Sequence, residues 1–438
     1  MQELNGLPKI PPTWSWSTIN DACLKVQDGT HFSPQNQLAQ GAYKYITAKN
    51  VRPSGLDLSN VSYLAEDEHR AIYKRCDPKK GDVLLVKDGV NTGDAAVNTL
   101  DEEFSLLSSV CLLRPRPALL YSQFLRYYLL SPVGYRMLTG QMTGTAIKRI
   151  ILGRIKGSPV PIAPLDEQRD IVAEIEKQFS RLDEAVANLK RVKANLKRYK
   201  ASVLKAAVEG RLFDDCRKGV KSNDWVNKPI DVAIDSLDQG WSPQCDNEPS
   251  DRPDAWGVIK TTAVQSMRYL ESENKRLPRA LRARPKLELV PGDLLMTRAG
   301  PRSRVGVVCL VKATRSHLML CDKVYRIRCK PGVASPAFLE LVLNAPNIVD
   351  ELNQLKTGIS DSGVNLTQKR LRELIIPLPS FKEQERIVAE VERRLSVIKE
   401  LEAAVEADLT RADRLRQSLL ARAFRGELCI EAKGAKCP

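Results

Sequence analysis

The feature that most constrains this chain is a stretch with helical periodicity from Asp166 to Phe213. No Pro or Gly occurs between Pro164 and Gly210, although the 438 residues include 24 Gly and 26 Pro. Apolar residues recur every seven positions, and others flank them three or four positions on. The heptad positions are Ile175, Leu182, Leu189, Leu196 and Val203, and the flanking positions are Phe179, Val186, Val192, Tyr199 and Ala206. This pattern predicts a long helix packed against another helix. About 48 residues would span roughly 70 Å.

A second stretch with the same pattern runs from Ser380 to Leu428. Glu383-Gln384 and Gly426 each lie 216 positions after Glu167-Gln168 and Gly210, so the two stretches align without a gap. The heptad positions are Val391, Ile398, Val405, Ala412 and Leu419, flanked by Leu395, Leu401, Leu409 and Leu415. Because residues outside the heptad positions match as well, the two stretches are copies of one unit. Since each stretch has a partner in the same chain, we expect them to pair with each other and not with a second chain.

The segments that precede the two helical stretches also correspond in order. Trp14 and Gly81-Asp82 have counterparts 211 positions later in Trp225 and Gly292-Asp293. The sequence therefore predicts an internal duplication. The expected divisions are a first globular unit at 1–165, a helix at 166–213, a second globular unit at 214–379, a helix at 380–428 and a tail at 429–438.

Each globular unit is expected to mix strands and helices. Alternating or buried apolar runs predict strands within 43–51, 78–89 and 106–117, and within 256–264 and 321–329. Apolar residues at helical spacing predict one helix at 120–140 and its counterpart at 336–355. The expected fold class is α+β.

Composition limits the function. The net charge of +15 favours a polyanion such as nucleic acid as partner. No apolar run is long enough to cross a membrane, and no signal peptide is visible, so we expect a cytoplasmic protein. Ten scattered Cys without a C-x-x-C pair predict free thiols. The three His lack metal-ligand spacing, and no metal site is expected.

No motif for enzyme chemistry is visible in the sequence. A G-x-x-x-x-G-K-[ST] phosphate loop, an Asn/Asp-Pro-Pro-Tyr adenine-methylation motif and a Ser/His/Asp constellation are all absent. Any enzyme chemistry would therefore have to come from partner proteins.

Basic and polar residues in turns are the candidate DNA contacts, because Arg and Lys fit phosphates and guanine edges. In the first unit they are Thr30, His31, Ser33, Lys87, Asn91, Thr92, Lys148 and Arg149. In the second unit they are Trp241, Lys275, Arg276, Arg279, Arg282, Arg284, Arg298, Arg302, Arg304, Lys369 and Arg370. For any one of these, a solvated surface charge is the competing interpretation.

A basic run on the first helical stretch has an open role. It comprises Lys190, Arg191, Lys193, Lys197, Arg198, Lys200 and Lys205. The run could be a solvated face, a contact with nucleic-acid phosphates between the two globular units, or a docking face for an acidic partner.

The combined pattern resembles the specificity subunit of type I restriction–modification systems. The resemblance covers nearly the full length. It rests on the duplicated globular–helix order, on the entries PIAPLDEQ and PLPSFKEQ, on the exits GRL and GEL, and on the Gly-Asp turn before a strand. It implies two target recognition domains, each reading one half of a bipartite site in double-stranded DNA. It also implies a pseudo-two-fold duplication, with two long antiparallel coiled-coil helices as the spacer.

The resemblance also implies partners and cofactors. Two methyltransferase subunits would dock on the helices, and restriction/translocase subunits would join them. S-adenosylmethionine, ATP and Mg would belong to those partners, and this chain would be non-catalytic. Two alternatives stay open at this point. One is a coiled-coil scaffold with two protein-binding heads, and the other is the specificity subunit of an enzyme whose nuclease is fused to the methylase.

Overall fold

The chain forms two compact units in a computed structural model. The structure describes residues 7–32, 34, 37–140, 149–213, 225–250, 252, 254–358 and 360–428. The first unit contains residues 1–189 and 407–438, and the second contains residues 190–406. Each unit thus includes part of both long helices, because the helices pack into the cores of the units that they adjoin. The predicted divisions at 165 and 379 lie within two residues of the first residue of each long helix.

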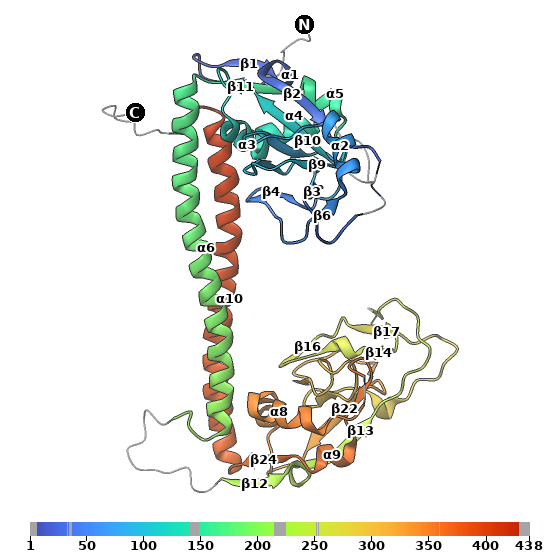
Figure 1. The fold of residues 1–438 in the computed structure, drawn as a ribbon. Helices are drawn as coiled ribbons and strands as arrows, with labels where there is room; N and C mark the ends of the chain where they lie inside the picture. Colours follow the sequence, from blue (N-terminus) through green and yellow to red (C-terminus); the bar gives the residue numbers. More distant parts are fainter. Residues whose placement is uncertain are drawn as a thin grey trace. The chain divides into compact units, whose positions relative to one another are not determined.

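The two long helices are α6 (Leu165–Val208) and α10 (Phe381–Ala423), coloured green and red in Figure 1. Within the first unit, Asp183 of α6 pairs with Arg416 of α10. Within the second, Lys193 Nζ lies 2.7 Å from Glu406 Oε2. Since residues early in α6 meet residues late in α10, the helices run antiparallel in each unit, as predicted.

The first unit is built on a four-stranded antiparallel sheet in the order β2-β10-β7-β8. Its strands are β2 (Cys23–Asp28), β10 (Val110–Pro115), β7 (Val83–Val86) and β8 (Ala95–Val97). Side chains of β7 alternate between two cores. Val83 and Leu85 join the core that contains the helices, and Leu84 and Val86 join a core on the other face. Both faces of this sheet are covered, which is why β7 is apolar at every position.

Further elements complete the first unit. They are the pair β1 (Ser15–Thr18) and β11 (Pro159–Ile162), a sheet of β6 (Ser62–Leu64), β3 (Tyr43–Ile46) and β9 (Phe104–Leu106), the hairpin β4 (Val51–Arg52) and β5 (Gly55–Leu56), and the helices α1 (Ile19–Ala22), α2 (Glu66–Arg75), α3 (Ser122–Leu130), α4 (Pro132–Thr139) and α5 (Leu152–Gly157).

The second unit repeats this topology. Its four-stranded sheet has the order β13-β22-β18-β20, made of β13 (Ile234–Gln239), β22 (Val324–Cys329), β18 (Leu294–Thr297) and β20 (Val308–Leu310). A sheet of β17 (Asn274–Arg276), β14 (Gly257–Ile259) and β21 (Leu318–Met319) matches β6-β3-β9, including the parallel pairing of its last two strands. The predicted duplication is therefore confirmed at the level of topology.

The second unit contains further elements, several of which have counterparts in the first. They are the pair β12 (Val226–Pro229) and β24 (Ile375–Leu378), the hairpin β15 (Val264–Gln265) and β16 (Arg268–Tyr269), the pair β19 (Ala299–Gly300) and β23 (Val364–Asn365), the 3-10 helices η2 (Ile230–Ala233), η3 (Thr261–Ala263) and η4 (Pro285–Leu287), and the helices α7 (Pro336–Asn344), α8 (Pro346–Leu355) and α9 (Gln368–Arg372). In the described part of the first unit, the isolated bridge between Asp88 and Arg149 follows β7 as the pair β19-β23 follows β18.

The predicted single helix at 120–140 is wrong, because two helices form there. Helix α3 ends at Leu130 and α4 begins at Pro132. The Ser131 hydroxyl accepts a hydrogen bond from the Gly134 N–H at 3.0 Å. Pro132 lacks the N–H that a continuous helix needs, whereas it suits the first turn of a new one. The same break occurs at Pro346 between α7 and α8. Similarly, the strand predicted over 43–51 is divided into β3 and β4.

A buried glutamine attaches each long helix to its globular unit. The Gln168 side chain donates to the carbonyls of Leu119 and Ala163 at 2.9 and 2.8 Å, and it accepts from the Tyr121 N–H at 2.8 Å. The Gln384 side chain makes the equivalent three bonds in the second unit, to Val333, Pro379 and Ser335. Both glutamines have no exposed surface. The repeated Glu-Gln pair in the sequence therefore marks a structural junction.

The helices end earlier than predicted, at Val208 and Ala423, because Gly210 and Gly426 terminate them. These glycines have φ values of +71° and +74°. In each case the next N–H bonds back across the last turn, from Arg211 to Ala206 and from Glu427 to Arg422, both at 2.9 Å. This left-handed glycine cap closes a helix, so the Gly-x-Leu exits encode helix termination.

The helix seam is narrower than predicted. Heptad positions such as Val203, Ile398 and Val405 are buried. By contrast, the flanking residues Val192, Tyr199, Leu401 and Leu415 are 44–50% exposed. Two helices alone cover only a narrow stripe of each other, so these flanking side chains stay at the surface of the pair.

Candidate nucleic-acid interface

In the first unit, the candidate interface is a group of loops at one end of the four-stranded sheet. The chain leaves β2 at Asp28 and turns at Gly29, whose backbone lies against that of Leu106. A Cβ atom at Gly29 would lie 2.0 Å from the Leu106 carbonyl oxygen. The Thr30 N–H bonds to that same oxygen at 2.8 Å. Only glycine permits this approach, and it brings Thr30 and His31 beside the loop that follows β7.

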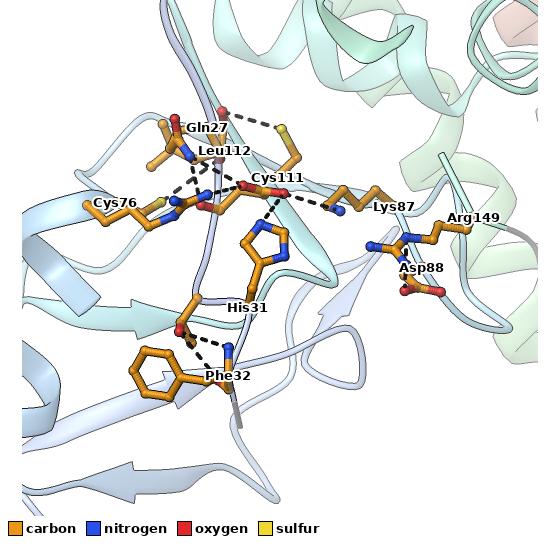
Figure 2. A network of polar contacts seen from close by, with 12 residues as sticks. Gln27, His31, Phe32, Cys76, Lys87, Asp88, Cys111, Leu112 and Arg149 are labelled. Carbon is orange, nitrogen blue, oxygen red and sulfur yellow. Dashed lines mark hydrogen bonds and ion pairs between the residues drawn. The ribbon is translucent and has the colours of Figure 1, made fainter. Parts of the chain in front are cut away.

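Asp28 is the centre of this group. Its carboxylate is 2% exposed and lies 3.3 Å from Lys87 Nζ, 3.1 Å from Arg75 Nη2 and 3.3 Å from His31 Nε2. Figure 2 shows the His31 ring and the Lys87 side chain directed at this carboxylate from different elements. Burial raises the pKa of Asp28, but hydrogen bonds from Arg75 and Lys87 outweigh burial and hold the pKa below its ordinary value.

The second unit keeps the backbone of this group and changes its charges. Gln239 faces Tyr325 in the sheet as Asp28 faces Cys111. A Cβ at Gly240 would meet the Leu320 carbonyl oxygen at 2.1 Å, as at Gly29. Arg298 follows β18 as Lys87 follows β7, but its Nε donates to the Asp322 carbonyl at 2.6 Å. A neutral amide thus replaces the buried carboxylate of the first unit.

The predicted contact residues of the first unit divide into buried and exposed groups. His31 and Arg149 are exposed, with 53% and 56% of their side chains accessible. Arg149 lies 3.7 Å from Asp88 and pairs with it through the backbone (Figure 2). Asn91 is half-buried in the same loop as Lys87. Ser33 and Lys148 lie outside the described residues.

Direct contacts from Thr30, Lys87 and Thr92 are not supported by their positions. All three are buried, and Lys87 is only 2% exposed with its ammonium group against Asp28. The Thr92 hydroxyl donates to the Gly89 carbonyl at 2.6 Å, inside its own turn. A basic residue in a glycine-rich loop suggested a surface charge, but the neighbouring buried carboxylate draws Lys87 inward. These residues shape the loops that carry the exposed ones.

The basic cluster at 275–286 in the second unit is largely exposed. Arg279, Arg282 and Arg284 are exposed, and the Arg284 guanidinium lies 4.0 Å from the centre of the Trp241 ring. This stacking fixes a cation over an aromatic surface, an arrangement suited to nucleic acids. Arg276 is less suited, because Asp246 and Glu248 neutralise it at 3.0 and 3.2 Å. Lys275 is half-buried on β17.

The other predicted arginines of the second unit differ in availability. Arg302 pairs with Asp361 at 2.9 Å and remains 42% exposed. The Arg304 guanidinium donates to the Gln265 side chain and to the carbonyls of Thr261 and Val264, so it braces the β15–β16 hairpin. Lys369 and Arg370 are exposed on α9, where Arg370 also bonds to the Leu355 carbonyl at 3.1 Å.

Two arginines that matter to these loops were missed from the sequence. Arg75 closes α2 and reaches Asp28 with a side chain that is 48% exposed. Arg326 is 3% exposed on β22 and donates to the carbonyls of Lys286 and Glu288, which fixes the end of the basic cluster. No sequence signal pointed to either residue, since each acts through partners that are distant along the chain.

Other features of the described residues bear on chemistry. Within the described ranges, no three His, Cys, Asp or Glu side chains gather so that they could hold a metal ion. The seven cysteines in the described part of the chain are free thiols, as predicted. No described helix has the length and apolar character needed to cross a membrane.

Comparison with known proteins finds relatives of one kind. The model of the type I restriction modification DNA specificity domain matches residues 11–198. The EcoEI specificity subunit of Escherichia coli is 42% identical over 183 residues, which cover 42% of this chain and only 31% of that protein. The EcoKI specificity subunit of Escherichia coli strain K12 is 26% identical over an alignment that covers 97% of this chain and 91% of that protein.

Solved structures support the same fold over nearly the full length. A chain from a type I restriction–modification system covers 96% of this chain and is itself fully covered, with 18% identity and a TM-score of 0.72. The HsdS subunit from Thermoanaerobacter tengcongensis covers 97% of this chain and is also fully covered, with 18% identity and a TM-score of 0.57. Residues 11–198 thus match the type I restriction modification DNA specificity domain, and the duplicated chain as a whole is similar to type I restriction enzyme specificity subunits over nearly its full length.

Proposed function

We propose that each unit of this chain reads one half of a bipartite site in double-stranded DNA, and that the chain thereby directs modification and restriction partners to that site. The observation that carries this proposal is the pair of loop groups at the same end of two sheets with the same topology. Their backbones agree at Gly29 and Gly240, whereas their charges differ at Asp28 and Gln239.

A shared scaffold with divergent loops suits two related but different recognition tasks. The loops of the first unit present His31, Arg75 and Arg149, while those of the second present Trp241 with a stacked Arg284 and further arginines. Base edges are discriminated by side-chain type, whereas phosphates accept any well-placed cation. Different side chains on equivalent loops would therefore specify different half-sites.

The long helices would set the spacing of the half-sites and dock two methyltransferase subunits. Val192, Tyr199 and Leu401 leave apolar side chains exposed on the helix pair, and such side chains would be covered by a docked protein partner. The basic run of α6 is mainly exposed, and we leave its partner open between DNA phosphates and an acidic protein surface.

The chemistry would belong to the partners. Methyl transfer would use S-adenosylmethionine in the methyltransferase subunits, and translocation with cleavage would use ATP and Mg in the restriction subunits. This chain would determine the DNA sequence to which the complex binds. Its place of action would be the cytoplasm, where bacterial DNA and these partners meet.

A methylation map of host DNA tests the proposal. Genomic DNA from cells with and without this gene, and with the partner genes intact, is sequenced by a method that detects methylated adenine. We expect one motif with two short specific parts and a fixed gap to lose its methylation when the gene is removed. An unchanged map, together with no salt-sensitive DNA binding by the purified complex, would indicate a protein scaffold instead.

A further inference from the structure

We infer that Asp28 is a positioning residue that holds Arg75 on the DNA-facing loops of the first unit, where Arg75 contacts a phosphate. This inference rests on the proposed function and adds to it a specific residue and the group that orients it. Arg75 belongs to α2, whereas Asp28 ends β2, so the contact joins two elements that are 47 positions apart in the sequence.

Arg75 adds a positive charge to an ion pair that is already neutral. Asp28 and Lys87 form a buried ion pair, with side chains 3% and 2% exposed and a separation of 3.3 Å. One ammonium group neutralises one carboxylate. The Arg75 guanidinium, which lies 3.1 Å from the same carboxylate, is therefore an additional positive charge. Unlike Lys87 it reaches the surface, with 48% of its side chain exposed.

The contact with Asp28 also orients the Arg75 guanidinium. Asp28 accepts a single hydrogen bond from Arg75, through Nη2, and a guanidinium has five N–H donors in a rigid planar fork. Anchoring one N–H of the fork on a buried carboxylate restricts the directions in which the other N–H groups can point. An arginine held in this way loses less side-chain entropy when it binds a phosphate than a freely rotating one would.

The second unit differs from the first at the equivalent positions. The connection between β6 and β7 carries α2, but the corresponding connection between β17 and β18 carries only the short helix η4. Gln239 replaces Asp28 in the sheet register, and Arg298 bonds to a backbone carbonyl and lies 5.7 Å from the Tyr325 ring. At this end of the sheet, therefore, the first unit holds an arginine on a buried carboxylate, whereas Gln239 offers no carboxylate at the equivalent position.

The test measures how salt affects DNA binding. The full chain, assembled with its methyltransferase partners, is titrated with a duplex that carries the mapped site at salt concentrations from about 50 to 200 mM. For Arg75→Gln we expect weaker binding at low salt and a loss of about one from the slope of log K against log salt, because one phosphate contact releases about one counterion. Arg75→Lys should recover most of the slope.

The matched control is Lys80→Gln. Lys80 is 60% exposed and precedes β7, whereas the Asp28 group lies at the far end of that strand. We expect its affinity and slope to equal those of the wild type. An Arg75→Gln variant that also keeps the wild-type slope would overturn the inference.

A second pair of variants tests Asp28 itself. Asp28→Asn leaves the buried Lys87 ammonium without a countercharge, which destabilises the fold. The double variant Asp28→Leu with Lys87→Met removes both charges, avoids that cost and leaves no side-chain oxygen to accept from Arg75. With Arg75 present but no longer held, we expect it to fold and to bind with the reduced slope of Arg75→Gln. A folded double variant with the wild-type slope would refute the positioning role. If the wild type shows no site-specific DNA binding, the proposed function fails instead.

Discussion

At the scale of single residues, the most informative positions are those whose purpose the sequence alone did not reveal. The sequence shows the same Glu-Gln pair at the start of both long helices. The structure shows that the glutamine of each pair is buried and bonds the helix to its globular unit. The sequence identified basic loop residues as candidate DNA contacts, but it could not predict which of them are buried. Lys87 and Arg75 look alike as charges in a sequence, yet a single carboxylate buries one and leaves the other half exposed.

Replacing Gln168 with alanine should destabilise the first unit by about 2–4 kcal/mol. The substitution leaves the Leu119 and Ala163 carbonyls and the Tyr121 N–H without their buried partner, and each unmet group costs on the order of 1 kcal/mol or more. Urea unfolding monitored by hydrogen exchange of peptides in α3 measures the loss. Gln178→Ala on the same helix, which removes a bond to Glu174, should cost less than about 0.5 kcal/mol. Equal costs for the two variants would contradict the junction role.

The stability of α2 should fall when the pH drops below about 6.5. His69 of α2 is fully buried, stacks on Tyr43 with ring centres 3.9 Å apart, and lies 3.0 Å from the Ser105 hydroxyl. Burial lowers the pKa of His69, and the nearby Glu103 offsets this only in part. The unfolded state therefore binds a proton more readily, so acidification favours unfolding.

Hydrogen exchange of α2 amides, corrected for intrinsic rates, tests this dependence at pH 7.5 and 5.5. We expect lower protection at pH 5.5 in the wild type and no such change in His69→Gln. Protection that changes equally in both proteins would assign the effect to another group.

At the scale of elements, the sequence predicted the helices and strands that are marked by hydrophobic periodicity or by turn residues. The heptad repeat located both long helices, and the Gly-Asp turns located β7 and β18, where Asp82 and Asp293 pair with Arg114 and Arg328 of the neighbouring strands. The break between α3 and α4 was missed, because apolar spacing continues through Pro132. The pairing order of strands could not be predicted, since it depends on contacts between distant segments.

The helix pair should act as a ruler if its length sets the half-site spacing. Deleting the seven residues 190–196 of α6 together with residues 403–409 of α10 keeps the heptad pattern and shortens both helices by one repeat. We expect the gap in the methylated motif to shrink by about three base pairs, since seven residues span about 10 Å. A matched variant that replaces the same residues by other heptad sequences should keep the gap. An unchanged gap in the deletion variant would exclude the ruler.

At the scale of the whole molecule, the central property is the internal duplication that relates the two units. Two units share strand order, helix breaks, glutamine junctions and glycine caps, and they differ in the loops at one end of each sheet. The sequence was sufficient to predict this duplication and the similarity to type I specificity subunits, because the markers recur at fixed spacing. Which loop side chains reach the surface depended on buried partners and had to come from the structure.

The most direct test of the central claim is a methylation map after the second recognition unit is exchanged. Residues 214–379 are replaced by the corresponding unit of another specificity subunit, and the host carrying the hybrid gene and its partner genes is mapped for methylated adenine. We predict that one half of the bipartite motif changes while the other half stays the same. A hybrid that methylates DNA with both halves changed, or with neither changed, would contradict the claim that each unit reads its own half-site.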